Sequence, residues 1–297
     1  MELPSKNLIS HVGLSVESKP PRDKEMPLWE HLAELGRRLK RVLIAFVVVF
    51  IVMWMPAPNL SGGSLLSVVT SFFVSGEYNP LAYWMFMQSI NPLLADLNKT
   101  GNVKIALIAG EVWNPLAAVM YASLYLTALV VFPYFVYQMW LYVQPALYPH
   151  EERAVKKYLW VALLLFYAGN LFGILIIYPS LFRFVVGLSH VIKVEQIFSV
   201  ASVVSTWIQI AFWTGLIFET PIVMAILSEI CLLNPWTLAE YRPLVYAVAL
   251  ILIAVVTPDT TLISTFLTFI PFAILFEVGL VWSRRIVRRC PDVQPRR

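Results

Sequence analysis

Apolar residues gather into six runs along the chain, and most charged residues lie between these runs. The runs cover residues 39–55, 116–143, 158–178, 203–232, 244–256 and 262–282. An α-helix needs about 20 apolar residues to cross the hydrocarbon core of a bilayer, which is about 30 Å thick. The pattern therefore predicts an all-α integral membrane protein with six transmembrane helices.

The last two runs are expected to form short helices that are joined by a tight turn at TPDTT. The fifth run has only 13 residues, so its helix covers about 20 Å, and the bilayer must thin around it or flanking side chains must reach the headgroups. The third run carries Gly169 and Gly173, a spacing that lets two helix backbones approach closely. Whether these glycines lie at a helix contact is open from the sequence alone.

Composition agrees with this class of protein and excludes a soluble domain. Of the 297 residues, 59% are hydrophobic and 13% are charged, and the mean hydropathy is +0.73. Soluble domains carry about 25% charged residues. This chain therefore has too few charged side chains to cover a surface that faces water.

The positions of Lys and Arg predict the orientation in the membrane. Eighteen of the 22 basic residues lie before residue 42, in the loops 144–157 and 233–243, or in the C-terminal tail. The other four lie on the opposite side of the expected helices: Lys99, Lys104, Arg183 and Lys193. Cytoplasmic segments carry the excess of Lys and Arg, so both termini are expected in the cytoplasm and the protein in the cytoplasmic membrane.

The chain is expected to hold one transmembrane domain, at residues 27–285. Residues 1–26 are polar and are predicted to be a disordered cytoplasmic leader, and residues 286–297 a basic cytoplasmic tail. The outer loop 56–115 is long and rather apolar, but prolines and a glycine interrupt it before any part reaches spanning length. We expect it to form interfacial helices that cap the outer face.

The first segment that could carry function is MPLWEHLAELGRRLKR, at 26–41. Four leucines share one face of a helix there: Leu28, Leu32, Leu35 and Leu39. Such a helix would lie in the cytoplasmic interface of the membrane. Glu34 on the other face either pairs with Arg38 at the i, i+4 spacing, which the spacing favours, or stays available as a receptor carboxylate.

The second segment is the cytoplasmic loop QPALYPHEERAVKK, at 144–157, which carries Pro145, Glu151 and Glu152. A metallopeptidase HExxH motif is excluded, because it needs a second histidine at residue 154, which is alanine. Glu152 is interpreted as part of a solvated turn. For Glu151, a solvated turn and a binding role both stay open.

The third set of candidates lies at membrane depth: Glu219, Glu277 and Asp259. An ionisable side chain inside a membrane span is costly unless it faces a cavity or a partner, so it is a functional hypothesis by default. Glu277 can reach the interface near the basic tail, whereas Glu219 lies about ten residues, roughly 15 Å, from the end of its run. Pro221 removes a backbone N–H beside it and disturbs the carbonyl of Ile217.

Several classes of chemistry have no motif in the sequence. It has no Walker A or glycine-rich nucleotide loop, no Cys/His cluster and no nucleophile elbow. We therefore expect no enzyme activity, no metal, no cofactor and no nucleic acid partner. A proton-coupled secondary transporter with Glu219 as its relay remains the alternative to a receptor, although no inverted repeat is visible.

Taken together, six strings resemble TatC, the polytopic core subunit of the twin-arginine protein translocase. They are HLAELGRRL (31–39), FPYFVYQMWLYVQPALYPHEER (132–153), FETP (218–221), YRP (241–243), TPD (257–259) and IPFAILFEVG (270–279). The resemblance runs in order from about residue 26 to residue 285. It implies a cupped arrangement of helices with a concave polar face.

The resemblance also implies roles for individual residues. Glu34 and Glu151 match the glutamates that receive the twin-arginine signal, and Glu219 matches the intramembrane glutamate where partner helices dock. The remaining matches lie in the strings just given: Phe135, Gln138, Trp140, Pro145, Asp259 and Glu277. Gly36 departs from the family, which often has a basic residue there, and this glycine loosens the helix by about 1 kcal/mol.

A member of this family would recognise the twin-arginine signal of a folded protein and admit the apolar segment of that signal beside its helices. The resemblance implies single-span partners similar to TatA and TatB, self-association in the lipid bilayer, and transport driven by the proton-motive force. It implies no covalent chemistry.

Overall fold

The computed structural model describes residues 28–55, 80–100, 106–146, 149–192, 197–256 and 262–287, and it is almost entirely helical in this part of the chain. Each apolar run of the sequence lies largely within helix. The matching helices are α1 (Leu28–Trp54), α4 (Asn114–Val143), α5 (Pro149–Phe172), α7 (Val200–Phe218) with α8 (Thr220–Glu229), α10 (Arg242–Val256) and α11 (Leu262–Ile286).

Among the described residues, four helical stretches are long and apolar enough to cross a membrane. They are Asn114–Val143, Val155–Ser189, Val200–Glu229 and Ser264–Ile286. The chain is therefore an all-α, multi-pass membrane protein, while a count of six spans stays a prediction. Helix α10 is short, as expected, with 15 residues. The expectation of a short last helix is wrong, because α11 has 25 residues and continues through Arg284 and Arg285, which favour a helix C-terminus.

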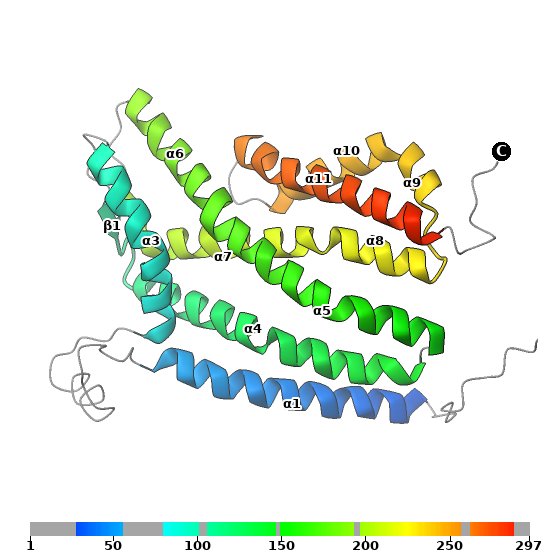
Figure 1. Ribbon diagram of the computed structural model, residues 1–297. Coiled ribbons are helices and arrows are strands. Elements are labelled where there is room, and N and C mark those ends of the chain that lie inside the picture. The colour runs from blue at the N-terminus through cyan, green and yellow to red at the C-terminus, as the bar shows by residue number, and fades with distance from the viewer. Residues whose placement is uncertain are drawn as a thin grey trace, which may run out of the picture.

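Figure 1 shows the helices running back and forth between two ends of the molecule. The start of α1, the end of α4, the start of α5 and the ends of α8 and α11 share one end, on the right of the view. The short helix α9 (Pro235–Glu240) lies at the same end and connects α8 to α10. This end carries the strings HLAELGRRL and HEER and the basic residues Arg284 and Arg285, so we call it the basic end.

Helix α5 continues almost unbroken through a π-helical turn, η2 (Gly173–Ile177), into α6 (Tyr178–Ile192). The helix is therefore much longer than the third apolar run. Arg183 was expected in an outer loop, and this is wrong: it lies in α6, where its Nη2 is 3.1 Å from Oδ2 of Asp96. The outer half of this helix is stabilised by packing against other protein elements, which hydropathy alone does not report.

The opposite end of the molecule is closed by α3 (Leu81–Thr100) and a two-stranded parallel sheet. Strand β1 (Ala106–Ile108) pairs with β2 (Ile197–Ser199) in the register Ala106↔Ile197. Parts of the expected interfacial loop therefore form ordered structure that caps this end.

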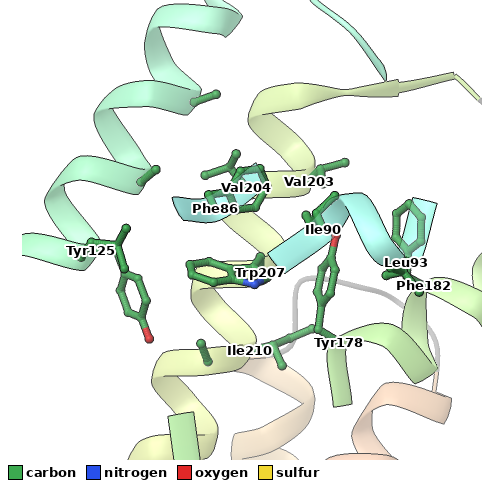
Figure 2. Close-up of a cluster of buried hydrophobic side chains, with 14 of the residues drawn as sticks. Phe86, Ile90, Leu93, Tyr125, Tyr178, Phe182, Val203, Val204, Trp207 and Ile210 are labelled. Carbon is green, nitrogen blue, oxygen red and sulfur yellow. The ribbon is translucent and has the colours of Figure 1, made fainter. Parts of the chain in front are cut away.

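Helix α3 is anchored in the hydrophobic core by side chains on one of its faces. Phe86, Ile90 and Leu93 are buried, and the ring of Phe86 meets Trp207 of α7 edge to face at 5.4 Å. Tyr125 of α4 contacts the same indole at 5.6 Å, as Figure 2 shows. The cap is thus part of the packed core.

Glycines let α5 approach α7 closely, which answers the question that the sequence left open. A Cβ added at Gly169 would lie 2.8 Å from the backbone oxygen of Thr214, and one at Gly173 would meet the Thr214 hydroxyl. Gly215 of α7 leaves room in the same way for Asn170 of α5. Both glycines of the third run therefore lie at a helix contact.

Candidate functional site

Two strings that lie a hundred residues apart in the sequence meet at the basic end. The ring of His31, near the start of α1, stacks on the ring of Tyr142, near the end of α4, with 4.4 Å between centroids and 22° between planes. Since α1 packs along α4, this contact joins HLAELGRRL to the string that leads into HEER. Sequence reasoning did not single out either ring, although both lie within the strings it used.

Glu34 forms the ion pair that its spacing favours. Nε of Arg38 donates to Oε1 of Glu34 at 3.0 Å, and Nη2 donates to the same oxygen at 2.5 Å. Glu34 lies one turn from His31, so it is beside the His31–Tyr142 contact. The carboxylate is therefore at the basic end and is already bound by a guanidinium group.

The leucine face of this segment does not form a separate interfacial helix. Residues 28–54 are one continuous helix, in which Leu32 and Leu39 are exposed while Glu34 and Arg38 are largely covered. In a membrane protein an apolar face can point to lipid, because lipid tails are as apolar as leucine. The stripe of α1 that carries Glu34 and Arg38 is thus the one that packs against the protein.

The HEER string lies in the first turns of a helix, and its expected loop conformation is wrong. Helix α5 begins at Pro149, which is favoured in the first turn because its missing N–H is not needed there. Acidic residues at a helix N-terminus are favoured as well. Glu151 lies in this turn, but its side chain is outside the described part of the structure.

The connection before α5 is a short 3-10 turn, η1 (Gln144–Ala146), in which Pro145 is exposed. Nε2 of Gln144 donates to Oε1 of Glu152 at 2.6 Å. Glu152 was interpreted as part of a solvated turn, and it instead ties the end of α4 to the start of α5.

The three candidates on α4 have different surroundings. Gln138 is buried, and its Nε2 donates to the hydroxyl of Tyr134 at 2.9 Å, while its Oε1 has no hydrogen-bond partner among the described residues. Trp140 is buried and Phe135 is exposed. Gln138 lies one turn from Tyr142 on the stripe that faces α1, so of the three it belongs with the site at the basic end.

Glu219 lies at a break between two helices. It ends α7 and starts α8, with Pro221 in the first turn of α8. The Thr220 hydroxyl donates to the Ile217 carbonyl at 2.7 Å, and this carbonyl is the one that Pro221 cannot bond. Oε1 of Glu219 is buried without a hydrogen-bond partner among the described residues, so this site can accept a hydrogen bond from an incoming donor.

A second buried polar group lies near the break. Asn170 accepts a hydrogen bond from the Tyr125 hydroxyl and donates to the Phe166 carbonyl at 2.9 Å. It faces Gly215, which is one helical turn from Glu219. Asn170 is the one polar residue in an apolar stretch of its helix, a signal that sequence reasoning could have used.

Glu277 is held by partners from the neighbouring helix. Nη2 of Arg242, at the start of α10, donates to its Oε2 at 2.9 Å, and the Tyr246 hydroxyl donates to Oε1 at 2.7 Å. Arg242 was not predicted as a site residue, although a basic residue that opens an apolar helix is a recognisable partner for an acidic one. Asp259 lies outside the described residues.

The arrangement offers hydrogen-bond acceptors and gives no sign of a metal centre. In the described part of the chain, no three His, Cys, Asp or Glu side chains come together in a way that could hold a metal ion. Carboxylates at the basic end can receive guanidinium or ammonium groups.

Comparisons with known proteins agree with this geometry. The family model for "Sec-independent protein translocase protein (TatC)" matches residues 30–271. The chain is 27% identical to TatCy of Bacillus subtilis, over 89% of this chain and 91% of the relative. It is 28% identical to TatC of Escherichia coli strain K12, over 87% and 88%.

A solved structure shows the same relationship. The crystal structure of the twin-arginine translocase receptor TatC matches with a TM-score of 0.65 and 26% identity, over 87% of this chain and all of that one. These comparisons do not favour the alternative of a proton-coupled secondary transporter.

Proposed function

The chain belongs to the TatC family of Sec-independent protein translocase proteins, and we propose that it is the receptor for twin-arginine signal peptides. In this proposal it is also the core subunit of a translocase that exports folded proteins with the proton-motive force. Members of this family are components of protein translocases, and the family is not recognised as a family of enzymes.

The observation that carries the proposal is the His31–Tyr142 contact, because it brings the Glu34 segment beside the segment that leads to Glu151. Two carboxylates at one end of the molecule can each accept a guanidinium fork. Arginine is preferred over lysine at such a site, since its planar donors match both carboxylate oxygens. Glu34 and Glu151 are therefore the proposed receptors of the two arginines.

Glu219 is the proposed docking point for a partner helix. Its buried acceptor oxygen lies at a helix break, and a polar side chain on an incoming helix can bond it without leaving a polar group in hydrocarbon. Single-span subunits similar to TatA and TatB are the proposed partners, together with further copies of this chain. No covalent chemistry is part of the proposal.

The proposed topology has six spans, with both termini and the basic end in the cytoplasm and the protein in the cytoplasmic membrane. The shared position of the basic segments in Figure 1 supports this orientation. The leader 1–26 and the tail 286–297 flank the domain 27–285 in this proposal, and a cupped helix arrangement with a concave polar face belongs to it.

Binding of a labelled signal peptide to the purified full chain tests the receptor role. The peptide carries either the arginine pair or two lysines, and the proteins are the wild type, Glu34→Gln and Glu151→Gln. We expect the arginine peptide to bind the wild type at least about tenfold tighter than the lysine peptide, since a bidentate charge-assisted contact is worth about 1.5–3 kcal/mol. Each glutamine variant should lose most of this difference.

Two neighbouring carboxylates serve as matched controls. Glu30→Gln and Glu152→Gln remove the same charge from the same helices, and they should keep the preference for arginine. The receptor assignment is wrong if both peptides bind equally well, or if Glu34→Gln and Glu151→Gln behave as these controls do.

A further inference from the structure

The guanidinium group of Arg38 already occupies the carboxylate that the proposed receptor would offer to a signal peptide. Both hydrogen bonds from Arg38 end on one oxygen, Oε1 of Glu34. The exposed fraction is 15% for the Arg38 side chain and 22% for Glu34. A covered, doubly bonded pair is held more firmly than an exposed pair of mobile side chains.

The pair lies on the stripe of α1 that faces the site. His31, Glu34, Arg38 and Val42 follow one another at intervals of three, four and four residues, so they share one face of the helix. His31 stacks on Tyr142 of α4 and Val42 is buried. Arg37, the next basic residue, is exposed on another face. Of these two arginines, Arg38 is the one that can compete for the carboxylate.

Full recognition of another arginine by Glu34 requires that Arg38 leave. A guanidinium fork binds a carboxylate by placing two parallel N–H groups on its two oxygens. Arg38 already binds one of these two oxygens, Oε1. We propose that Arg38 is an internal competitor of the signal peptide: it imitates the arginine of the signal and lowers the affinity of Glu34 for an external arginine. This inference rests on the proposed receptor function.

The competition acts mainly on arginine ligands. An arginine fork needs both carboxylate oxygens and must displace Arg38, whereas the ammonium of a lysine can bind the other oxygen while Arg38 stays on Oε1. Removal of Arg38 should therefore tighten binding of the arginine peptide more than binding of the lysine peptide.

The test compares Arg38→Gln with Arg37→Gln in the full-length protein. Both variants remove one positive charge from the same helical turn, so both reduce the general repulsion of a basic peptide. We expect Arg38→Gln to bind the arginine peptide about two- to fivefold tighter than Arg37→Gln, a factor that corresponds to a partly covered ion pair. Arg38→Lys, which keeps the charge but not the fork, should lie between the wild type and Arg38→Gln.

A double variant shows whether Arg38 acts through Glu34. In the Glu34→Gln background, Arg38→Gln should add nothing beyond Arg37→Gln, because the carboxylate for which Arg38 competes is gone. Competition is overturned if Arg38→Gln binds the arginine peptide no tighter than Arg37→Gln does, or if it tightens binding of the lysine peptide by as much as binding of the arginine peptide. If Glu34→Gln alone leaves peptide binding unchanged, the receptor role of Glu34 fails, and this proposal fails with it.

Discussion

The Thr220 hydroxyl donates a 2.7 Å hydrogen bond to the Ile217 carbonyl, which Pro221 leaves without its normal helical partner. The threonine of FETP therefore supplies a hydrogen bond to this carbonyl at the break where Glu219 lies. Within a membrane no water is available to satisfy such a carbonyl. The break can thus be held open beside Glu219 without leaving a bare acceptor in hydrocarbon.

Replacement of Thr220 tests how much this hydrogen bond contributes to stability. Thr220→Val keeps the shape of the side chain but removes the donor, and we expect it to lower the free energy of unfolding by about 1–3 kcal/mol. Thr220→Ser keeps the donor and should lose much less. Thermal unfolding of the purified variants in detergent measures the difference, and equal stability of the two variants would show that the hydrogen bond is unimportant.

A second proline leaves a backbone carbonyl without its helical partner in a different helix. Pro133 interrupts the hydrogen bonding of α4, and the Tyr167 hydroxyl of α5 donates to the Leu129 carbonyl at 2.6 Å. We expect Tyr167→Phe to destabilise the protein by about 1–2 kcal/mol. In a Pro133→Ala background, residue 133 supplies the missing N–H, so the same change should have a smaller effect. An undiminished effect in that background would contradict this account.

The sequence predicted the existence of the main helices but not all of their extents or surroundings. Hydropathy located each apolar run because burial in lipid and burial in protein select the same side chains. It could not locate the outer half of the helix that ends at Ile192 or the burial of Phe86, because contacts between distant segments stabilise them. It placed HEER in a loop for a different reason: the first turns of α5 are polar, so hydropathy does not report them, although Pro149 and the acidic residues favour a helix start there.

The candidate sites also differ in whether their contacts lie within one segment or join distant segments, and only the first kind could be predicted. Spacing along one helix predicted the Glu34–Arg38 pair, because both partners lie in a single segment. Neither the Arg242–Glu277 pair nor the Tyr125–Asn170 pair could be predicted, since each joins helices that are far apart in the sequence. Chemistry between helices depends on which faces meet, and membrane helices give little sign of this in their hydropathy.

The close contact between α5 and α7 leads to a prediction with a control in the same continuous helix. A Cβ at Gly173 would meet the Thr214 side chain and lie 3.1 Å from the Ile210 oxygen, whereas one at Gly187 of α6 meets nothing within 4 Å. We expect Gly173→Ala to destabilise by about 1–3 kcal/mol. Gly187→Ala should be neutral or stabilising by up to about 1 kcal/mol. The same sign for both variants in thermal unfolding would argue against the close packing.

The Arg242–Glu277 pair predicts an energetic coupling between α10 and α11. The side chains are 38% and 40% exposed, so screening limits the coupling to about 0.5–1 kcal/mol. A double-mutant cycle with Arg242→Gln and Glu277→Gln measures it by thermal unfolding. Additive effects would mean that Glu277 does not depend on Arg242.

The place where a signal peptide binds tests the central claim most directly. A signal peptide with a photoreactive residue beside its arginine pair is crosslinked to the full chain, and mass spectrometry identifies the attached residues. The account predicts crosslinks near His31 and Tyr142 and in the HEER turn, and their loss when the arginine pair is replaced by lysines. Crosslinks to α3 and β1 at the opposite end, or crosslinks at the basic end that survive this replacement, would contradict it.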